Sequence, residues 1–98
     1  MALMQISVIP LGTIPSYAAF VADFQKVLAA SNLSFTLTDM ATIVEGDTAE
    51  LLAIAAKIHE IPYSKGVQRV LTSISIDDRR DKAVHLGDKI QAVKNKLQ

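Results

Sequence analysis

The stretch VQRVLTSISI, residues 67 to 76, carries the strongest strand pattern in the sequence and sets the fold class. Apolar and small polar residues alternate along it, with the period of two that a strand with one buried face requires. β-branched residues dominate it, and these favour strands over helices. One face of the predicted strand carries Val70, Thr72, Ile74 and Ile76, and the other carries Leu71, Ser73 and Ser75.

The residues before this strand predict an amphipathic helix. Asp47 and Glu50 have the spacing of a capping-box variant, in which the carboxylate three residues on accepts from the backbone of the N-cap. Pro62 and Gly66 are expected to bound the helix. Its buried stripe is predicted to contain Leu51, Leu52, Ile54, Ala55, Ile58 and Ile61.

The residues after the strand predict a charged turn and a last helix. The turn is DDRRDK, residues 77 to 82, and lysines near the far end of the helix suit the negative end of its dipole. The apolar residues of this helix recur at spacings of four, three and four, as one helical face requires. They are Leu86, Ile90, Val93 and Leu97.

The N-terminal third predicts one strand and one helix. Residues 3 to 9 alternate as a strand does, and Pro10 and Gly12 are expected to end it. The apolar residues that follow recur at spacings of three and four, with Ser16 as the start signal and Asn32 as the stop signal. An amphipathic helix is therefore expected between them.

A hairpin is predicted between the two helices. LSFTLT, residues 33 to 38, alternates apolar and threonine side chains, and MATIVEG, residues 40 to 46, is β-branched and ends in glycine. The turn-prone Asp39 lies between them. The order of elements is thus β-α-β-β-α-β followed by one more helix.

That order is the signature of a ferredoxin-like α+β sandwich, in one domain over residues 1 to 98. Two helices are expected to cover one sheet face. Only the last helix or another subunit remains to cover the other face. The functional site is expected on this other face. This open face is predicted to present Gln5, Ser7, Thr36, Thr38, Ser73 and Ser75, mixed with Leu3, Ile9 and Leu71.

Composition narrows the function classes. The 98 residues are 50% hydrophobic and 20% charged, which indicates a folded domain with more apolar surface than one small chain covers, and hence an oligomer. Ten basic residues balance ten acidic ones, so nucleic acid is not an expected partner. The absence of cysteine argues against disulfides, a thiolate nucleophile and Cys-based zinc. The apolar start predicts a strand instead of a signal peptide or membrane span, with a cytoplasmic location.

Several candidate sites emerge from the residues alone. Hydroxyls on a rigid strand face can bind a polar heterocycle, although threonine also favours strands that simply face solvent. Glu45, at a strand end, can accept from an amino group or offset a cation, and Asp39 competes for that role. The DDRRDK run suits a phosphate, a subunit contact or a solvated turn. No catalytic motif stands out, which weakens an enzyme hypothesis without excluding it. The residues alone predict a small ligand-binding or regulatory protein.

Three segments together resemble the small thiamine-binding protein family across essentially the whole chain. They are ISVIPLGT at residues 6 to 13, TDMATIVEG at 38 to 46 and RVLTSISIDDRRDK at 69 to 82. The resemblance implies a ferredoxin-like fold assembled as a dimer of dimers, a homotetramer. It also implies non-enzymatic binding of thiamine or its hydroxymethylpyrimidine moiety, in thiamine handling, salvage or sensing. No cofactor and no metal are expected, because the sequence has no motif for either.

The resemblance and the chemistry of an aminopyrimidine together suggest a set of ligand-binding residues. They are Ser7, Pro10, Leu11, Gly12, Thr13, Thr38, Met40, Thr42, Glu45 and Ser73. The alternative function is a regulatory or assembly module whose homotetramer binds a different small ligand. Gly87 departs from the better helix formers that the family tends to have at the start of the last helix.

Overall fold

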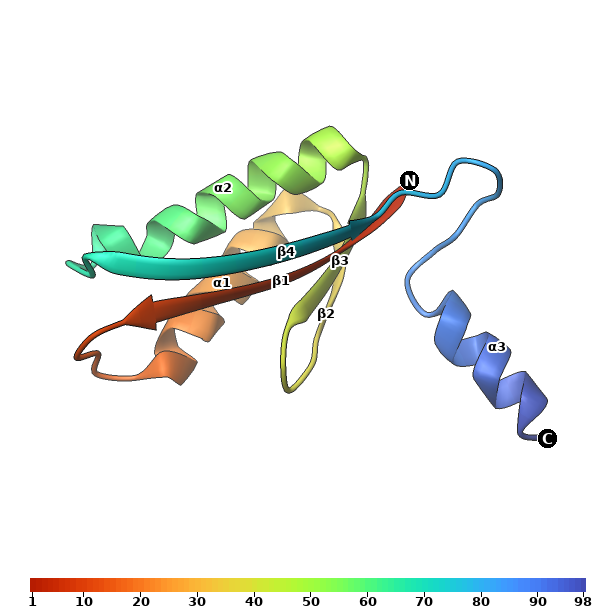
Figure 1. Ribbon diagram of the computed structural model, residues 1–98, viewed down its shortest axis with the longest axis horizontal. Coiled ribbons are helices and arrows are strands. Elements are labelled where there is room, and N and C mark those ends of the chain that lie inside the picture. The colour runs from red at the N-terminus through yellow and green to blue at the C-terminus, as the bar shows by residue number, and fades with distance from the viewer.

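A computed structural model describes residues 1–98 and shows a four-stranded antiparallel sheet with three helices (Figure 1). The sheet order is β2-β3-β1-β4, which confirms the predicted ferredoxin-like α+β fold with an extra C-terminal helix. The elements are β1 (Ala2–Leu11), α1 (Tyr17–Ser31), β2 (Ser34–Leu37), β3 (Thr42–Gly46), α2 (Thr48–Ser64), β4 (Arg69–Asp77) and α3 (Asp88–Lys96).

Helix α1 begins and ends at the residues that the sequence indicates. The Ser16 hydroxyl accepts a hydrogen bond from the Ala19 amide at 3.2 Å, which satisfies one of the free amides of the first turn. Asn32 ends the helix in the left-handed region at φ 63°, a conformation that asparagine tolerates better than most residues.

Helix α2 starts and ends as predicted, although it includes Pro62. Glu50 Oε1 accepts from the Asp47 amide at 3.2 Å, as the capping box requires. The helix ends at Ser64, between the two residues expected to bound it, Pro62 and Gly66. Pro62 lacks the amide hydrogen for one helical hydrogen bond, but its carbonyl still accepts from the Lys65 amide at 3.0 Å in the last turn. Leu52, expected in the buried stripe, is 51% exposed.

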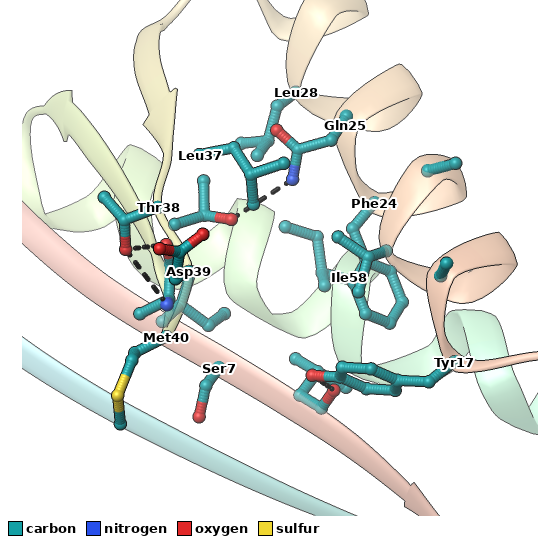
Figure 2. A pocket seen from close by; sticks show the side chains of 17 residues that line it. Ser7, Tyr17, Phe24, Gln25, Leu28, Leu37, Thr38, Asp39, Met40 and Ile58 are labelled. Carbon is teal, nitrogen blue, oxygen red and sulfur yellow. Dashed lines mark hydrogen bonds between the residues drawn. The ribbon is translucent and has the colours of Figure 1, made fainter.

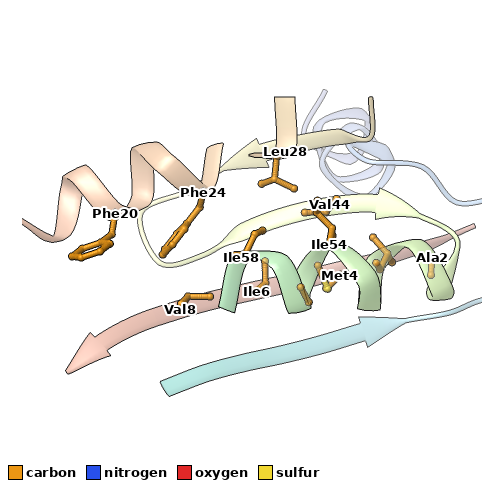
Figure 3. Close-up of a cluster of buried hydrophobic side chains, with 12 residues drawn as sticks. Ala2, Met4, Ile6, Val8, Phe20, Phe24, Leu28, Val44, Ile54 and Ile58 are labelled. Atoms are coloured by element: carbon orange, nitrogen blue, oxygen red, sulfur yellow. The ribbon is translucent and has the colours of Figure 1, made fainter. Parts of the chain in front are cut away.

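The hydrophobic core fills the space between the sheet and the two helices α1 and α2 (Figure 3). Alternate residues of β1 point into it, and Phe24 and Leu28 of α1 meet Ile58 of α2 there. Each fully buried side chain of this size contributes about 1.5–3 kcal/mol of transfer free energy. The fully buried large side chains are Met4, Leu28, Val44, Leu51, Ile58 and Pro62.

Strand β1 is longer than predicted, because it continues through Pro10 to Leu11. A proline fits inside a strand where its missing amide would face away from the paired neighbour. The pairing of β1 with β4 continues to Leu11, whereas its pairing with β3 ends at Ile6 opposite Thr42. The second half of β1 therefore has one free edge, on the side of the β2–β3 turn.

The sheet face opposite the helices is uncovered, and α3 stands apart from the two packed helices (Figure 1). No residue of α3 is buried. Gly87 precedes this helix in the left-handed region at φ 94°, which explains a glycine where a better helix former was expected. None of the helices combines the length and the apolar character that a membrane span needs.

Candidate ligand-binding site

A cavity of about 640 Å³ lies beside the free edge of β1 (Figure 2). It is bounded by α1, by the turn between β2 and β3, and by β1, with Ile58 of α2 contributing to the wall. Twelve of its 17 lining residues are hydrophobic. A mostly apolar cavity of this volume with a few polar groups is typical of a small-molecule site. We refer to it as the α1 cavity.

Small side chains on α1 leave the space open. Ala18 and Ala22 lie one turn apart and both line the cavity, so this side of the helix fills little volume. Tyr17, Val21 and Gln25 follow one another at spacings of four and form the adjacent line on the same helix. The Tyr17 hydroxyl donates to the Val8 carbonyl of β1 at 3.3 Å, which ties the start of α1 to the free strand edge.

The turn between β2 and β3 forms the opposite wall. The Thr38 hydroxyl donates to the Ala41 carbonyl at 2.7 Å, and the Ala41 amide donates back to that hydroxyl at 3.2 Å. These bonds fix the turn and leave Asp39 and Met40 as its exposed tip. Met40 is 89% exposed, so its thioether is available to a ligand that enters here.

One hydrogen-bonded pair joins the helix and sheet sides of the cavity. Gln25 Nε2 of α1 donates to Thr42 Oγ1 at the start of β3, at 3.1 Å. Thr42 is 8% exposed and is the most buried polar residue of the wall. A buried hydroxyl needs such a partner, since leaving it unpaired costs about 1–3 kcal/mol.

The structure brings together four of the residues predicted for the site. Ser7, Thr38, Met40 and Thr42 all line the α1 cavity. The segment from Pro10 to Leu11 belongs to the far end of β1, and Gly12 and Thr13 follow it; none of them lines this cavity. Ser73 pairs with Ser7 across the sheet and also lies outside the wall.

Glu45 lies away from the cavity and holds the C-terminal segment. Its Oε1 accepts from the Leu86 amide at 2.7 Å, and His85 Nδ1 lies 3.3 Å from the same oxygen. Its side chain is only 12% exposed. The register pairs Glu45 with Leu3, so this contact lies on the open face of the sheet.

Sequence reasoning missed Tyr17 and Gln25, and it gave Asp39 only second place to Glu45. One signal was present for Gln25, because it continues the line of Tyr17 and Val21 at a spacing of four where an apolar residue would be expected. A polar side chain at that position faces the sheet and needs a partner there.

The other candidate features are weaker as sites. A shallower cavity of about 430 Å³ lies between α2 and β4 beside His59 and Thr72. His59 Nδ1 is 2.7 Å from Thr72 Oγ1, so the imidazole has a structural partner. In the charged run, Arg79 pairs with Asp81 and Arg80 with Asp78, all within two residues. No cluster of three metal-ligating side chains is present.

Comparison with known proteins identifies the family. A family model described as thiamine-binding protein matches residues 4–94. The UPF0045 protein YqgV of Bacillus subtilis is 46% identical over 103 residues, which cover 100% of this chain and 99% of the relative. A UPF0045 protein of Staphylococcus xylosus is 41% identical, over 99% of this chain and 95% of its own. The chain therefore belongs to the thiamine-binding protein family.

Solved structures support the same fold. A hypothetical protein of Methanocaldococcus jannaschii superposes with a TM-score of 0.84 at 30% identity, covering 95% of both chains. A candidate thiamine biosynthesis or salvage protein of Thermotoga maritima superposes with a TM-score of 0.77 at 13% identity, covering 94% of this chain and 97% of its own. At that identity the second likeness concerns the fold alone.

Proposed function

We propose that the protein binds thiamine or its hydroxymethylpyrimidine moiety in the α1 cavity, without catalysing a reaction, as part of thiamine handling, salvage or sensing in the cytoplasm. The observation that carries this proposal is the cavity itself, which has an apolar wall, a buried polar pair at Thr42 and a carboxylate at its exposed turn. Its 640 Å³ fall within the ~300–1,000 Å³ of small-molecule sites. The family description as a binding protein supports the same role.

The chemistry of thiamine matches the two ends of the cavity. Its aminopyrimidine half is neutral and offers one amino donor and ring-nitrogen acceptors, which suit the Gln25–Thr42 pair. Its thiazolium half is a cation, which suits the carboxylate of Asp39 and the ring face of Tyr17 on the cavity wall. The Thr38 hydroxyl and the Met40 thioether, at the turn between β2 and β3, complete the proposed contacts. Glu45 and Ser73 lie outside the α1 cavity, on the open face of the sheet, and an alternative binding site for the same ligand would lie there.

A substitution that fills the cavity tests this proposal. Ala22→Phe places a ring in the α1 cavity, whereas Ala29→Phe makes the same change at an exposed position of α1 outside it. Isothermal titration with thiamine, hydroxymethylpyrimidine and thiamine diphosphate should show saturable binding to the wild type and to Ala29→Phe, and a loss of roughly tenfold or more in Ala22→Phe. Equal affinities in both variants would reject the cavity as the site.

The second candidate function is the regulatory or assembly module, a homotetramer arranged as a dimer of dimers that binds a different small ligand. It is favoured by the apolar residues that the single chain leaves exposed, among them Leu71 of the open sheet face and Ile90 and Val93 of α3. Saturable binding of another heterocycle in the α1 cavity, with no response to thiamine or its pyrimidine half, would favour this candidate.

A further inference from the structure

The α1 cavity contains one polar pair that uses less than half of its hydrogen-bonding capacity. Gln25 has two amide hydrogens and a carbonyl oxygen, and Thr42 has one hydroxyl hydrogen and two lone pairs. The bond from Gln25 Nε2 to Thr42 Oγ1 uses one donor of the amide and one lone pair of the hydroxyl. The amide oxygen, the second amide hydrogen, the hydroxyl hydrogen and the second hydroxyl lone pair remain, and both side chains line the cavity.

The unused groups form an adjacent acceptor and donor. A flip of the amide would reverse the bond and present an amide hydrogen beside a hydroxyl lone pair, so either assignment leaves one donor next to one acceptor. Because Thr42 is 8% exposed, a ligand that covers the pair must replace the water that would otherwise satisfy these groups. A ligand edge that carries one donor beside one acceptor can replace this water, because it pairs with an unused acceptor and an unused donor.

The other polar groups of the wall are committed elsewhere, lie at the exposed turn or face away from the cavity. Ser7 pairs directly with Ser73, so its hydroxyl points to the open face of the sheet. The Thr38 hydroxyl closes the turn with Ala41, and the Tyr17 hydroxyl donates to the Val8 carbonyl. Asp39 is exposed and, when ionised, can only accept. The pair of Gln25 and Thr42 is therefore the part of the wall best suited to recognising the hydrogen-bonding pattern of a neutral heterocycle.

We propose that Gln25 and Thr42 act together as the specificity-determining residues of the cavity, and that they select a heterocycle carrying an amino group next to a ring nitrogen. This inference rests on the proposed function and adds the residues that recognise the pyrimidine half. One side chain contacts the amino group and the other contacts the ring nitrogen. An analogue without the amino group leaves the pair with an unpaired polar atom, which is a strong source of discrimination.

The test crosses variants with ligands. Gln25→Leu and Thr42→Val each remove one member of the pair at similar side-chain size, and Thr42→Ser keeps the hydroxyl. Thr36→Val is the matched control, since Thr36 is an exposed threonine on the opposite sheet face. Each protein is titrated with hydroxymethylpyrimidine and with the same compound lacking the amino group.

The wild type, Thr42→Ser and Thr36→Val should prefer the amino compound by roughly tenfold or more. In Gln25→Leu and Thr42→Val the preference should fall to nearly one, through lost affinity for the amino compound alone. Unchanged preference in these two variants would overturn the inference and leave the cavity proposal intact. A wild type that binds neither compound would overturn both, as would an Ala22→Phe variant that binds as well as the wild type.

Discussion

Two carboxylates of the β2–β3 hairpin, Glu45 and Asp39, lie in different surroundings. The sequence placed Glu45 ahead of Asp39 as the group that faces a ligand, because Asp39 already had a role as a turn residue. In the structure Glu45 accepts from the Leu86 amide, while Asp39 lies on the wall of the α1 cavity. A hydrogen bond across 41 residues of chain was beyond prediction from local sequence.

Asp39→Asn should affect the binding of thiamine but not the binding of its neutral pyrimidine half. Removing the charge should weaken thiamine, whose thiazolium is cationic, by roughly twofold to fivefold, the range of an exposed ion pair. Neutral hydroxymethylpyrimidine should bind with unchanged affinity. Titration calorimetry at low ionic strength measures both. An equal loss for the two ligands would show that Asp39 does not recognise the cation.

At the scale of elements, every strand and helix could be predicted from hydrophobic period and cap residues, and the order fixed the fold. The cavity could not. It exists because β3 stops pairing with β1 at Ile6 while β4 continues to Leu11, and because Ala18 and Ala22 face the gap. These two causes depend on the register between strands and on the side-chain volumes of neighbouring elements. The hydrophobic pattern of a single element encodes neither the register nor the fit between elements. The polar Gln25 in the apolar line of α1 was the single local signal.

The two packed helices are also joined by an ion pair whose strength depends on pH. Lys65 Nζ, at the end of α2, lies 2.8 Å from Asp23 Oδ2 of α1. This hydrogen bond is the main cause that lowers the pKa of Asp23 below its ordinary value of 3.8, against a smaller opposing effect of desolvation. The unfolded chain therefore binds a proton more readily, so the pair stabilises the fold above the ordinary pKa and is lost as pH falls through the lowered one.

Asp23→Asn should accordingly lower the free energy of unfolding at neutral pH. The difference from the wild type should be constant well above the ordinary pKa of 3.8 and should shrink as the pH falls below it through the lowered pKa, since protonated Asp23 no longer pairs with Lys65. Urea unfolding at several pH values measures this difference. Glu60→Gln, at an exposed position of α2, is the control and should show no such trend. A pH-independent difference for Asp23→Asn would contradict the role given to the ion pair.

At the scale of the whole molecule, the chain leaves two apolar surfaces uncovered. Ile9 and Leu71 pair across the open sheet face, at 39% and 54% exposure. The α3 residues Ile90, Val93 and Leu97 are 63%, 59% and 80% exposed. Surfaces of this kind mark interaction sites, and a second copy of the chain is the proposed occupant. The contact of Glu45 with Leu86 fixes the start of the α3 segment beside the open face.

Val93→Asp should therefore shift the assembly towards smaller species at micromolar concentration, because a buried unpaired charge is costly in an apolar interface. Lys94→Asp introduces the same residue at the neighbouring exposed position and should shift it less. Sedimentation equilibrium measures the distribution. A monomeric wild type at these concentrations would contradict the proposed homotetramer.

Binding of the ligand in the α1 cavity is checked by the change in backbone amide resonances during titration with hydroxymethylpyrimidine. The ligand is proposed to bind on the helix side of the sheet, in the α1 cavity. The amides of Val8, Gln25 and Thr42 should therefore shift with a common saturation curve, while those of Ser73 and Ser75 on the open face stay in place. Saturable shifts confined to Ser73, Ser75 and Glu45 would place the ligand on the open face and contradict the account.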